Sequence, residues 1–239
     1  MPIEINHVAH PRGFASNVGR LNKSLKINCI LKEYGGMKER TTLLDIGTGN
    51  GEIASYLSEF YDVVSVDITD QRTVCDGFTF VQLGGEGLPF SDKSFDVVVS
   101  NHVIEHVADA DQHLSEIERV LKEGGLAYLA TPNRFWPWEV HNEIPLLHYL
   151  PTATFNSVLK RLGRHYEDFF PLTWWALSRK AEKYFSVNIV SDRICKWPLQ
   201  YHMPCYPLAA RILSWIPLRF YRMCTFIHPT LVVVLKSKR

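Results

Sequence analysis

The stretch Leu43-Leu44-Asp45-Ile46-Gly47-Thr48-Gly49-Asn50-Gly51 predicts a buried strand that runs into a glycine-rich turn. A helical segment is expected to follow at 52–60, so strand, glycines and helix come in the order that a nucleotide-binding βα unit requires. Glycines in such a turn let the backbone approach a ligand and leave the N–H groups at the helix start free. Asp67 ends the next apolar run about 20 residues on, where a carboxylate can accept hydrogen bonds from ribose hydroxyls. The pattern therefore favours a nucleoside-type ligand over a purely structural turn.

The spacing of the glycines distinguishes between nucleoside ligands. A dinucleotide-binding turn has the pattern G-x-G-x-x-G, whereas Gly47, Gly49 and Gly51 form G-x-G-x-G. Glu52 occupies the position where the third glycine of a dinucleotide fold would stand. The glycine spacing of this turn therefore argues against NAD as its ligand.

Short apolar runs alternate with helical periods along the chain. Because runs that are apolar throughout are typical of strands buried on both faces, they predict a parallel sheet covered by helices, an α/β architecture. The expected strands are 42–47, 62–67, 78–83, 95–100, 125–131, 186–190 and 231–235. A helix is expected before the first strand, as a cover or as a substrate lid. Another begins with Asp109 as its cap and is expected to end at Gly124-Gly125.

Composition narrows the class of protein. The 239 residues are 46% hydrophobic and 21% charged, which suits one globular domain over 1–239. A formal net charge of +1 is far less basic than a chain that binds nucleic acid usually carries. The five cysteines are scattered and form no CxxC pair, so a reducing, cytoplasmic environment is expected. The first residues lack the apolar run of a secretory signal, and no run is long enough to span a membrane, so the protein is expected to be soluble or at most surface-bound.

Several motifs in series resemble those of the class I S-adenosylmethionine-dependent methyltransferases. They lie at 43–51, 63–67, 85–92, 94–107 and 120–125, so the resemblance extends from Thr42 to about Asn133. It implies S-adenosyl-L-methionine as the cofactor. It also implies a Rossmann-like, doubly wound α/β fold with a seven-stranded, mostly parallel sheet and helices on both faces. The chain looks similar to small-molecule enzymes of the ubiquinone and menaquinone pathways and of bacterial glycan or lipid pathways.

With this resemblance the single domain divides into four segments. Residues 1–40 form an N-terminal helical cap, and 41–133 form the cofactor-binding core. Residues 134–185 form the acceptor-site segment, and 186–239 carry the C-terminal strands with an aromatic helical insertion. The helical insertions would then cap the acceptor site.

The resemblance also implies which residues bind the cofactor. Asp67 would take the ribose hydroxyls, and Ile68 would lie against the adenine. Family members often have an acid at the position of Gly84, so adenine recognition here is expected from Glu86 or from backbone groups. The residues expected along the methionine moiety are Asp45, Gly47, Thr48, Gly49 and Gly51. Those expected on the other side of the adenine are Glu86, Gly87 and Leu88. Asn101 and His102 are expected beneath the sulfonium.

A hydroxyl acceptor would need a base, and histidine suits this role because its ordinary pKa of about 6.5 lies near working pH. His141 and His148 follow the fifth strand, where this family usually builds the acceptor site; a structural or orienting role is the alternative. His102, Glu105 and His106 resemble the metal site of some family members. Because Glu-His-Val at this position is widespread in metal-free members, no metal is expected.

The acceptor is expected to be a small molecule, because the aromatic segment 131–151 resembles those of glycan- and lipid-pathway methyltransferases. The predicted function is methyl transfer, to oxygen in the first place and to nitrogen in the second. The alternatives are an inactive cofactor-binding scaffold and an NAD-dependent oxidoreductase. Apolar residues alternate with arginines in 206–227, which is consistent with packing, with a dimer interface, or with peripheral contact at the inner membrane face. The oligomeric state stays open.

Overall fold

The structure is a computed structural model, which describes residues 17–35, 41–85, 87–137, 145–150, 152–162 and 169–238. A seven-stranded sheet forms its centre, in the order β3-β2-β1-β4-β5-β7-β6. The strands are β1 (Thr42–Ile46), β2 (Asp62–Asp67), β3 (Thr79–Gln82), β4 (Phe95–Asn101), β5 (Leu121–Pro132), β6 (Phe185–Ile189) and β7 (Thr230–Ser237). The first five run parallel, whereas β7 is antiparallel to both β5 and β6. The seven-stranded, mostly parallel sheet expected from the resemblance is confirmed.

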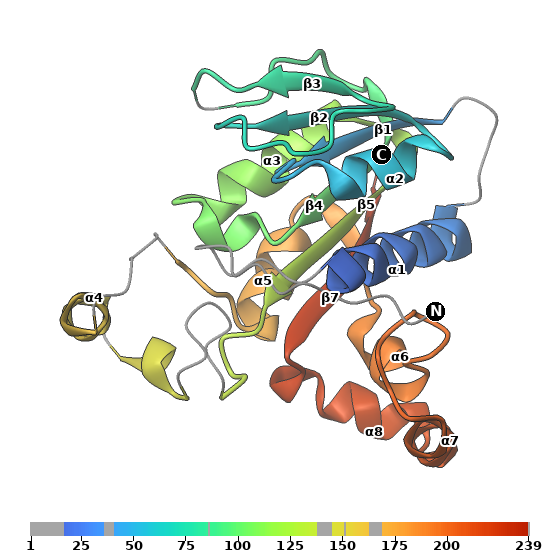
Figure 1. Ribbon diagram of the computed structural model, residues 1–239, viewed down its shortest axis with the longest axis vertical. Coiled ribbons are helices and arrows are strands. Elements are labelled where there is room, and N and C mark those ends of the chain that lie inside the picture. Colours follow the sequence, from blue (N-terminus) through green and yellow to red (C-terminus); the bar gives the residue numbers. More distant parts are fainter. Residues whose placement is uncertain are drawn as a thin grey trace, which may run out of the picture.

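Helices cover both faces of this sheet (Figure 1), and each face has its own apolar layer. On one face lie α1 (Asn17–Gly35), α2 (Glu52–Ser58) and α6 (Ser191–Lys196), whose buried residues include Ile27, Leu57 and Ile194. On the other face lie α3 (Ala110–Val120) and α5 (Trp174–Ala181), which bury Leu114 and Leu177. The central strands β1, β4 and β5 are therefore mostly buried, as their apolar runs predict, whereas the edge strand β3 is not.

The start of α3 agrees with its sequence, but its end does not. Asp109 caps the helix, and its carboxylate accepts hydrogen bonds from the N–H groups of Asp111 and Gln112 at 2.9 and 3.2 Å. The helix ends at Val120 rather than at Gly124-Gly125. The carbonyls of Arg119 and Val120 accept from the N–H groups of residues 93 and 94 at 2.9 and 2.8 Å, and the chain then pairs with the start of β4. Pairing with a neighbouring strand therefore ends the helix before the glycines are reached.

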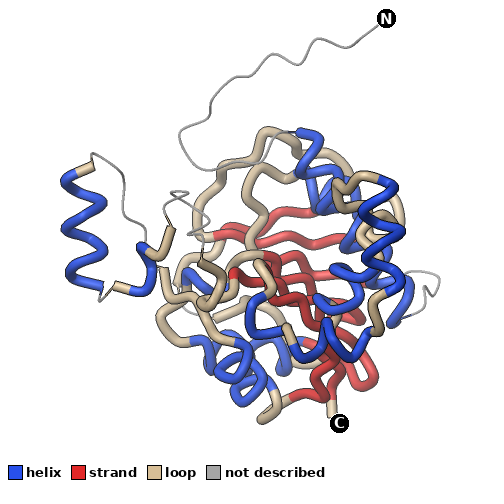
Figure 2. Tube along the Cα trace, turned by 90° about the horizontal axis from the view of Figure 1, so that it is seen from below, coloured by secondary structure: helices blue, strands red, loops and turns tan. Residues whose placement is uncertain are grey.

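Two groups of helices lie away from the central sheet. Helix α4 (Thr152–Arg161) packs with the short helix η2 (Leu147–Tyr149), and both views show α4 apart from the sheet (Figure 2). Helices α7 (Pro207–Trp215) and α8 (Leu218–Met223) lie at the opposite end from β3, and η1 (Ile104–His106) and η3 (Thr225–Ile227) are single turns. Among the described helices, none combines the length and the apolar character needed to cross a bilayer.

Candidate active site

The sheet order fixes where a ligand can bind. Strand β1 lies between β2 and β4, so the chain crosses to one side of β1 to form β2 and β3 and returns to its other side to form β4. A crevice therefore opens at the carboxyl ends of β1 and β4. The glycine-rich turn follows β1 at this point. The N–H groups of Gly47 and Thr48 both donate to the Val66 carbonyl, at 2.8 and 3.2 Å, which holds the turn against the end of β2.

Two of the glycines are required by close contacts. Gly47 and Gly51 have φ values of 86° and 87°, in the left-handed region. A Cβ atom on Gly47 would lie 2.4 Å from a Val103 methyl carbon, and one on Gly51 would lie 2.0 Å from the Val74 carbonyl oxygen. Gly49 also has a positive φ, of 53°, but its Cβ position has no atom within 4 Å. The turn is thus packed at both ends and open in the middle.

Asp67 is fixed beside this open position. The Gly49 N–H donates to one carboxylate oxygen at 3.0 Å, and the Thr69 N–H donates to the other at 3.3 Å. A carboxylate has about four lone-pair directions, so these two bonds leave capacity for further donors. The structure therefore brings Asp67 and Gly49 together, as the resemblance implies.

Asp45 lies beneath the turn and is 2% exposed. The Ser65 hydroxyl donates to its carboxylate at 2.7 Å and lies 2.6 Å from the Thr48 hydroxyl. Burial raises the pKa of Asp45 to about 7; the Ser65 hydrogen bond opposes the shift, and the charge of Asp67 adds to it. A cationic group bound nearby would favour the ionised form of Asp45.

The expected adenine side is open and partly apolar. Ile68 follows β2 and is 69% exposed, which is unusual for a large apolar side chain. A surface pocket of about 340 Å³ is lined by residues from Val81 to Pro89, Gly87 and Leu88 among them. A Cβ atom on Gly84 or Gly85 would meet no atom within 4 Å. An aromatic ring could therefore approach this backbone closely.

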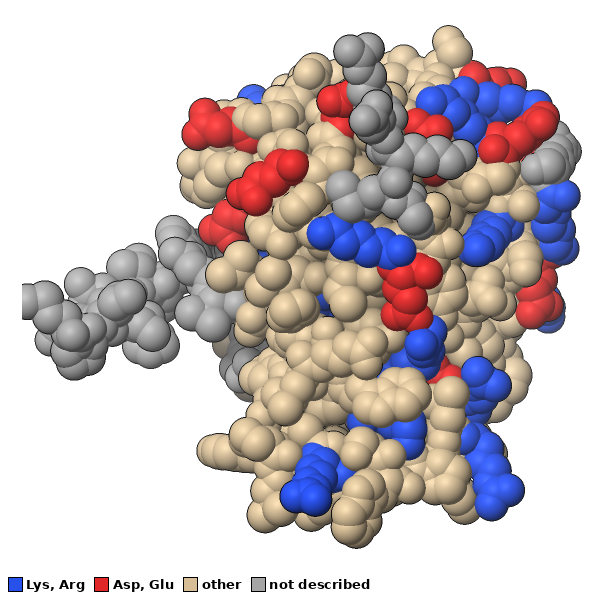
Figure 3. Space-filling model, turned by 90° about the vertical axis from the view of Figure 1, so that its right-hand side faces the viewer, with Lys and Arg blue, Asp and Glu red and all other residues tan. Residues whose placement is uncertain are grey.

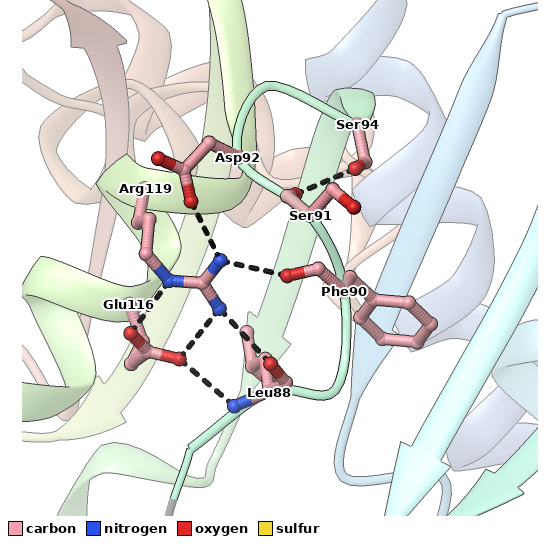
Figure 4. Close-up of polar contacts among 7 residues, drawn as sticks. All are labelled: Leu88, Phe90, Ser91, Asp92, Ser94, Glu116 and Arg119. Atoms are coloured by element: carbon pink, nitrogen blue, oxygen red, sulfur yellow. Dashed lines mark hydrogen bonds and ion pairs between the residues drawn. The ribbon is translucent and has the colours of Figure 1, made fainter.

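Two residues of α3, Glu116 and Arg119, form a clamp that holds the loop 88–92 beside this pocket (Figure 4). The Glu116 carboxylate accepts from the Leu88 N–H at 2.8 Å. Arg119 donates to the carbonyls of Leu88 and Phe90 at 2.9 and 2.7 Å and to the Asp92 carboxylate at 2.9 Å. Glu116 and Arg119 also pair with each other at 2.8 Å. Sequence reasoning missed this clamp, and its only signal is an acid three residues before an arginine on one helix.

At the end of β4, Asn101 and His102 lie in the crevice region. The carboxamide oxygen of Asn101 is buried and has no hydrogen-bond partner among the described residues, so a bound donor could satisfy it. His102 has a φ of 61°, and its Nδ1 lies 3.1 Å from the Glu105 carboxylate. Glu105 is fully buried and accepts from the Thr131 hydroxyl at 3.0 Å. Burial raises the pKa of Glu105, but the hydrogen bond and charge of His102 outweigh it and lower the pKa overall.

The described residues contain no group of three or more side chains arranged to hold a metal ion. Two of the predicted site residues, Glu86 and His141, lie outside the described residues. The backbone of His148 lies in η2, but its side chain also lies outside what the structure describes. The proposed base is therefore untested.

One histidine in this region was not singled out from the sequence. His228 is 5% exposed, and neither ring nitrogen has a hydrogen-bond partner in the described parts of the chain. Its carbonyl accepts from the Asn133 side chain at 2.9 Å, so it lies at the carboxyl end of β5, where the acceptor-site segment begins. Burial lowers its pKa, against the charge of Asp192. It precedes a proline in an aromatic insertion far from the motif series, so the sequence carries no signal for it.

Comparisons with known proteins show what this chain is similar to. The sequence profile of the methyltransferase domain family matches residues 44–129. An uncharacterized methyltransferase of Mycolicibacterium paratuberculosis is 37% identical over 128 residues, which are 50% of this chain and 50% of that protein. A demethylmenaquinone methyltransferase of Chlorobaculum parvum is 26% identical over 177 residues, which are 60% of this chain and 73% of that one. The chain spans about half the length of the mycobacterial relatives that it matches.

Solved structures show the same fold. Phosphoethanolamine N-methyltransferase 2 of Haemonchus contortus superposes with a TM-score of 0.57 at 20% identity, over 91% of this chain and 53% of that chain. An S-adenosylmethionine-dependent methyltransferase of Listeria monocytogenes gives a TM-score of 0.56 at 14% identity, over 91% and 99% of the two chains. Residues 44–129 therefore match the methyltransferase domain family, and the chain shares its overall fold with these solved methyltransferases.

Proposed function

We propose that the chain transfers a methyl group from S-adenosyl-L-methionine to a small-molecule acceptor. The observation that supports this most directly is the open Gly49 position, with Asp45 beneath it and Asp67 beside it, at the switch point of the sheet. The sequence match of residues 44–129 to the methyltransferase domain supports the choice of cofactor.

The described residues have the chemistry that this cofactor needs. When bound, S-adenosyl-L-methionine supplies a methyl group activated by the positive sulfur. Asp67 would accept from the ribose hydroxyls, and Asp45 would stabilise the ammonium, because a nearby cation favours the ionised form of a buried carboxyl. Ile68 offers an exposed apolar surface for adenine, and Gly87 and Leu88 line a surface pocket that adenine could also contact. The unpaired Asn101 oxygen offers one further acceptor.

Methyl transfer from a sulfonium needs alignment and exclusion of water, and a base where the acceptor is a hydroxyl. We propose oxygen as the first choice of methylated atom and nitrogen as the second, with His141 or His148 as the base. Relatives are named for acceptors as different as demethylmenaquinone and phosphoethanolamine, so their names do not select one. A saccharide or lipid-linked acceptor is proposed from the aromatic segment 131–151.

Calorimetric titration with S-adenosylhomocysteine, beside NAD and NADH, tests the cofactor. Saturable binding of the homocysteine nucleoside alone is expected. Replacing Asp67 by alanine removes a charged acceptor, so affinity is expected to fall roughly tenfold to a hundredfold. The matched control is Asp62→Ala, because Asp62 is exposed and begins the strand that Asp67 ends. Binding of NAD alone, or equal affinity in Asp67→Ala and the wild type, would contradict the assignment.

A further inference from the structure

The helices α7 and α8 turn their apolar side chains outward. No residue of either helix is buried. Leu208, Ile212 and Trp215 are 73%, 57% and 77% exposed, and their spacing puts them on one face of α7. A surface helix ordinarily turns such a stripe toward the core. Here the stripe is solvent-exposed in the described structure.

The two helices are held by polar contacts instead. The Lys196 ammonium donates to the Ser214 carbonyl at 2.6 Å, which ties the end of α7 to α6. The Tyr221 hydroxyl donates to the Leu213 carbonyl at 2.9 Å and joins α8 to α7. Arg222 pairs with the buried Asp192 at 2.9 Å. Polar contacts therefore anchor both helices to the body, while Leu208, Ile212 and Trp215 stay exposed.

Exposed apolar residues continue beyond α7. Tyr206 precedes it and is 84% exposed, and Met223 of α8 is 69% exposed. We call these residues, with Leu208, Ile212, Trp215 and Phe220, the α7–α8 patch. Clusters of this kind on a single chain mark contact surfaces more often than chance exposure. Tyrosine and tryptophan are the side chains enriched where apolar and wet regions meet.

The charge around the patch is one-sided. Residues 206–227, which include both patch helices, hold three arginines and no aspartate or glutamate. This segment therefore carries a formal charge of +3, and its Arg222 is paired with Asp192 of α6. Arg211 and Arg219 are exposed within the patch helices. At the lower end of the molecule, Lys and Arg side chains stand among uncharged surface (Figure 3).

We propose that the α7–α8 patch binds the surface of an anionic phospholipid bilayer. Outward apolar and aromatic side chains flanked by arginines are the chemistry of a helix that lies in the membrane interface. A second copy of the chain fits less well, because the same patch on both copies would bring the exposed Arg211 and Arg219 of each copy together. Lipid binding of this kind does not depend on the methyl-transfer activity proposed above.

Co-sedimentation of the full chain with vesicles tests the proposal. The wild type is expected to partition onto vesicles of phosphatidylcholine mixed with phosphatidylglycerol and not onto phosphatidylcholine alone, and added salt should weaken the binding. The double substitution Arg211→Gln, Arg219→Gln is expected to lower the partition coefficient about thirtyfold. Its control is Lys160→Gln, which removes an exposed charge from α4.

The contribution of the apolar side chains to vesicle binding is tested with Ile212→Ser, which is expected to lower the partition coefficient at least about fivefold. The control is Leu162→Ser, because Leu162 is 55% exposed against 57% for Ile212. Circular dichroism and S-adenosylhomocysteine binding report folding in each variant, independently of lipid. Equal partitioning of the wild type and the patch variants would overturn the proposal. The proposal would also be overturned if the wild type failed to bind anionic vesicles. A concentration-dependent dimer that Ile212→Ser abolishes would then assign the patch to an interface between two copies of the chain.

Discussion

Replacing Asp45 by asparagine is expected to stabilise the cofactor-free protein, and more so as the pH rises. The pKa of Asp45 is raised by burial from its ordinary 3.8 to about 7, so the folded state holds a proton that the unfolded state releases. Stability from this group is complete below pH 3.8 and is lost as the pH rises to about 7. At 1.36 kcal/mol per unit, the whole window amounts to about 4 kcal/mol.

Asparagine keeps the size and the hydrogen-bond acceptor of Asp45 but cannot ionise. The variant Asp45→Asn therefore does not lose stability from this position as the pH rises. Urea unfolding of both proteins at pH 5 and pH 8 gives the comparison. The difference in unfolding free energy between Asp45→Asn and the wild type should grow by about 3 kcal/mol over this interval. Comparing the two proteins at each pH removes the contribution of every other titrating group.

Bound S-adenosylhomocysteine should shrink that difference, because its ammonium favours the ionised carboxyl. Its affinity for the wild type is therefore expected to rise with pH between 5 and 7, and its affinity for Asp45→Asn to change much less. Asp62→Asn is the control, since Asp62 is exposed at the other end of β2. A stability difference that stays constant with pH would refute the burial argument.

The remaining predictions concern the turn and α1. Gly51→Ala is expected to lower the unfolding free energy well beyond the roughly 1–2 kcal/mol of a left-handed alanine, because its Cβ would also lie 2.0 Å from the Val74 carbonyl oxygen. Gly49→Ala is the control, because its alanine would also have backbone strain but a Cβ with no atom within 4 Å. Equal thermal midpoints of unfolding in the two variants would contradict a close contact between the Gly51 position and Val74. Lys26 is 7% exposed, and burial, helped by the charge of Lys23, lowers its pKa from 10.5 to about 8. Stability from this group is present above pH 10.5 and is lost as the pH falls to about 8, so Lys26→Met should gain about 3 kcal/mol at pH 7 in urea unfolding and little at pH 11. If Lys26→Met were instead less stable than the wild type at pH 7, the prediction would be wrong, because favourable contacts of the ammonium would then outweigh its burial.

The parts of the site that the sequence predicts are those set by the backbone. Residues 43–51 end a buried strand and turn sharply into a helix, and the left-handed, closely packed positions of this turn select glycine. Asp67 is predictable for the same reason, because it ends the neighbouring strand and the parallel register brings strand ends to one edge. The sheet follows from the apolar runs, with one helix end misplaced by strand pairing.

The parts that could not be predicted depend on side chains that meet across the fold. Glu116 and Arg119 contact a loop about thirty residues earlier in the chain, and helical periodicity says nothing about the partner of a polar face. His228 reaches the acceptor region only because β7 inserts beside β5. An apolar stripe such as that of α7 has the same pattern whether it faces a core or solvent. Three-dimensional placement alone separates these two cases.

The position of β7 has a consequence for synthesis on the ribosome. Because β7 lies between β5 and β6, the sheet cannot be completed until residues 230–237 have emerged, although β1 to β5 are made long before. Until then β5 is an unpaired edge whose buried residues include Leu126, Tyr128 and Leu129. A nascent chain that stalls before β7 would therefore expose an apolar strand edge of the kind that chaperones recognise and that aggregates form on. Closure of the sheet therefore waits for its last strand and comes late in the folding of this domain.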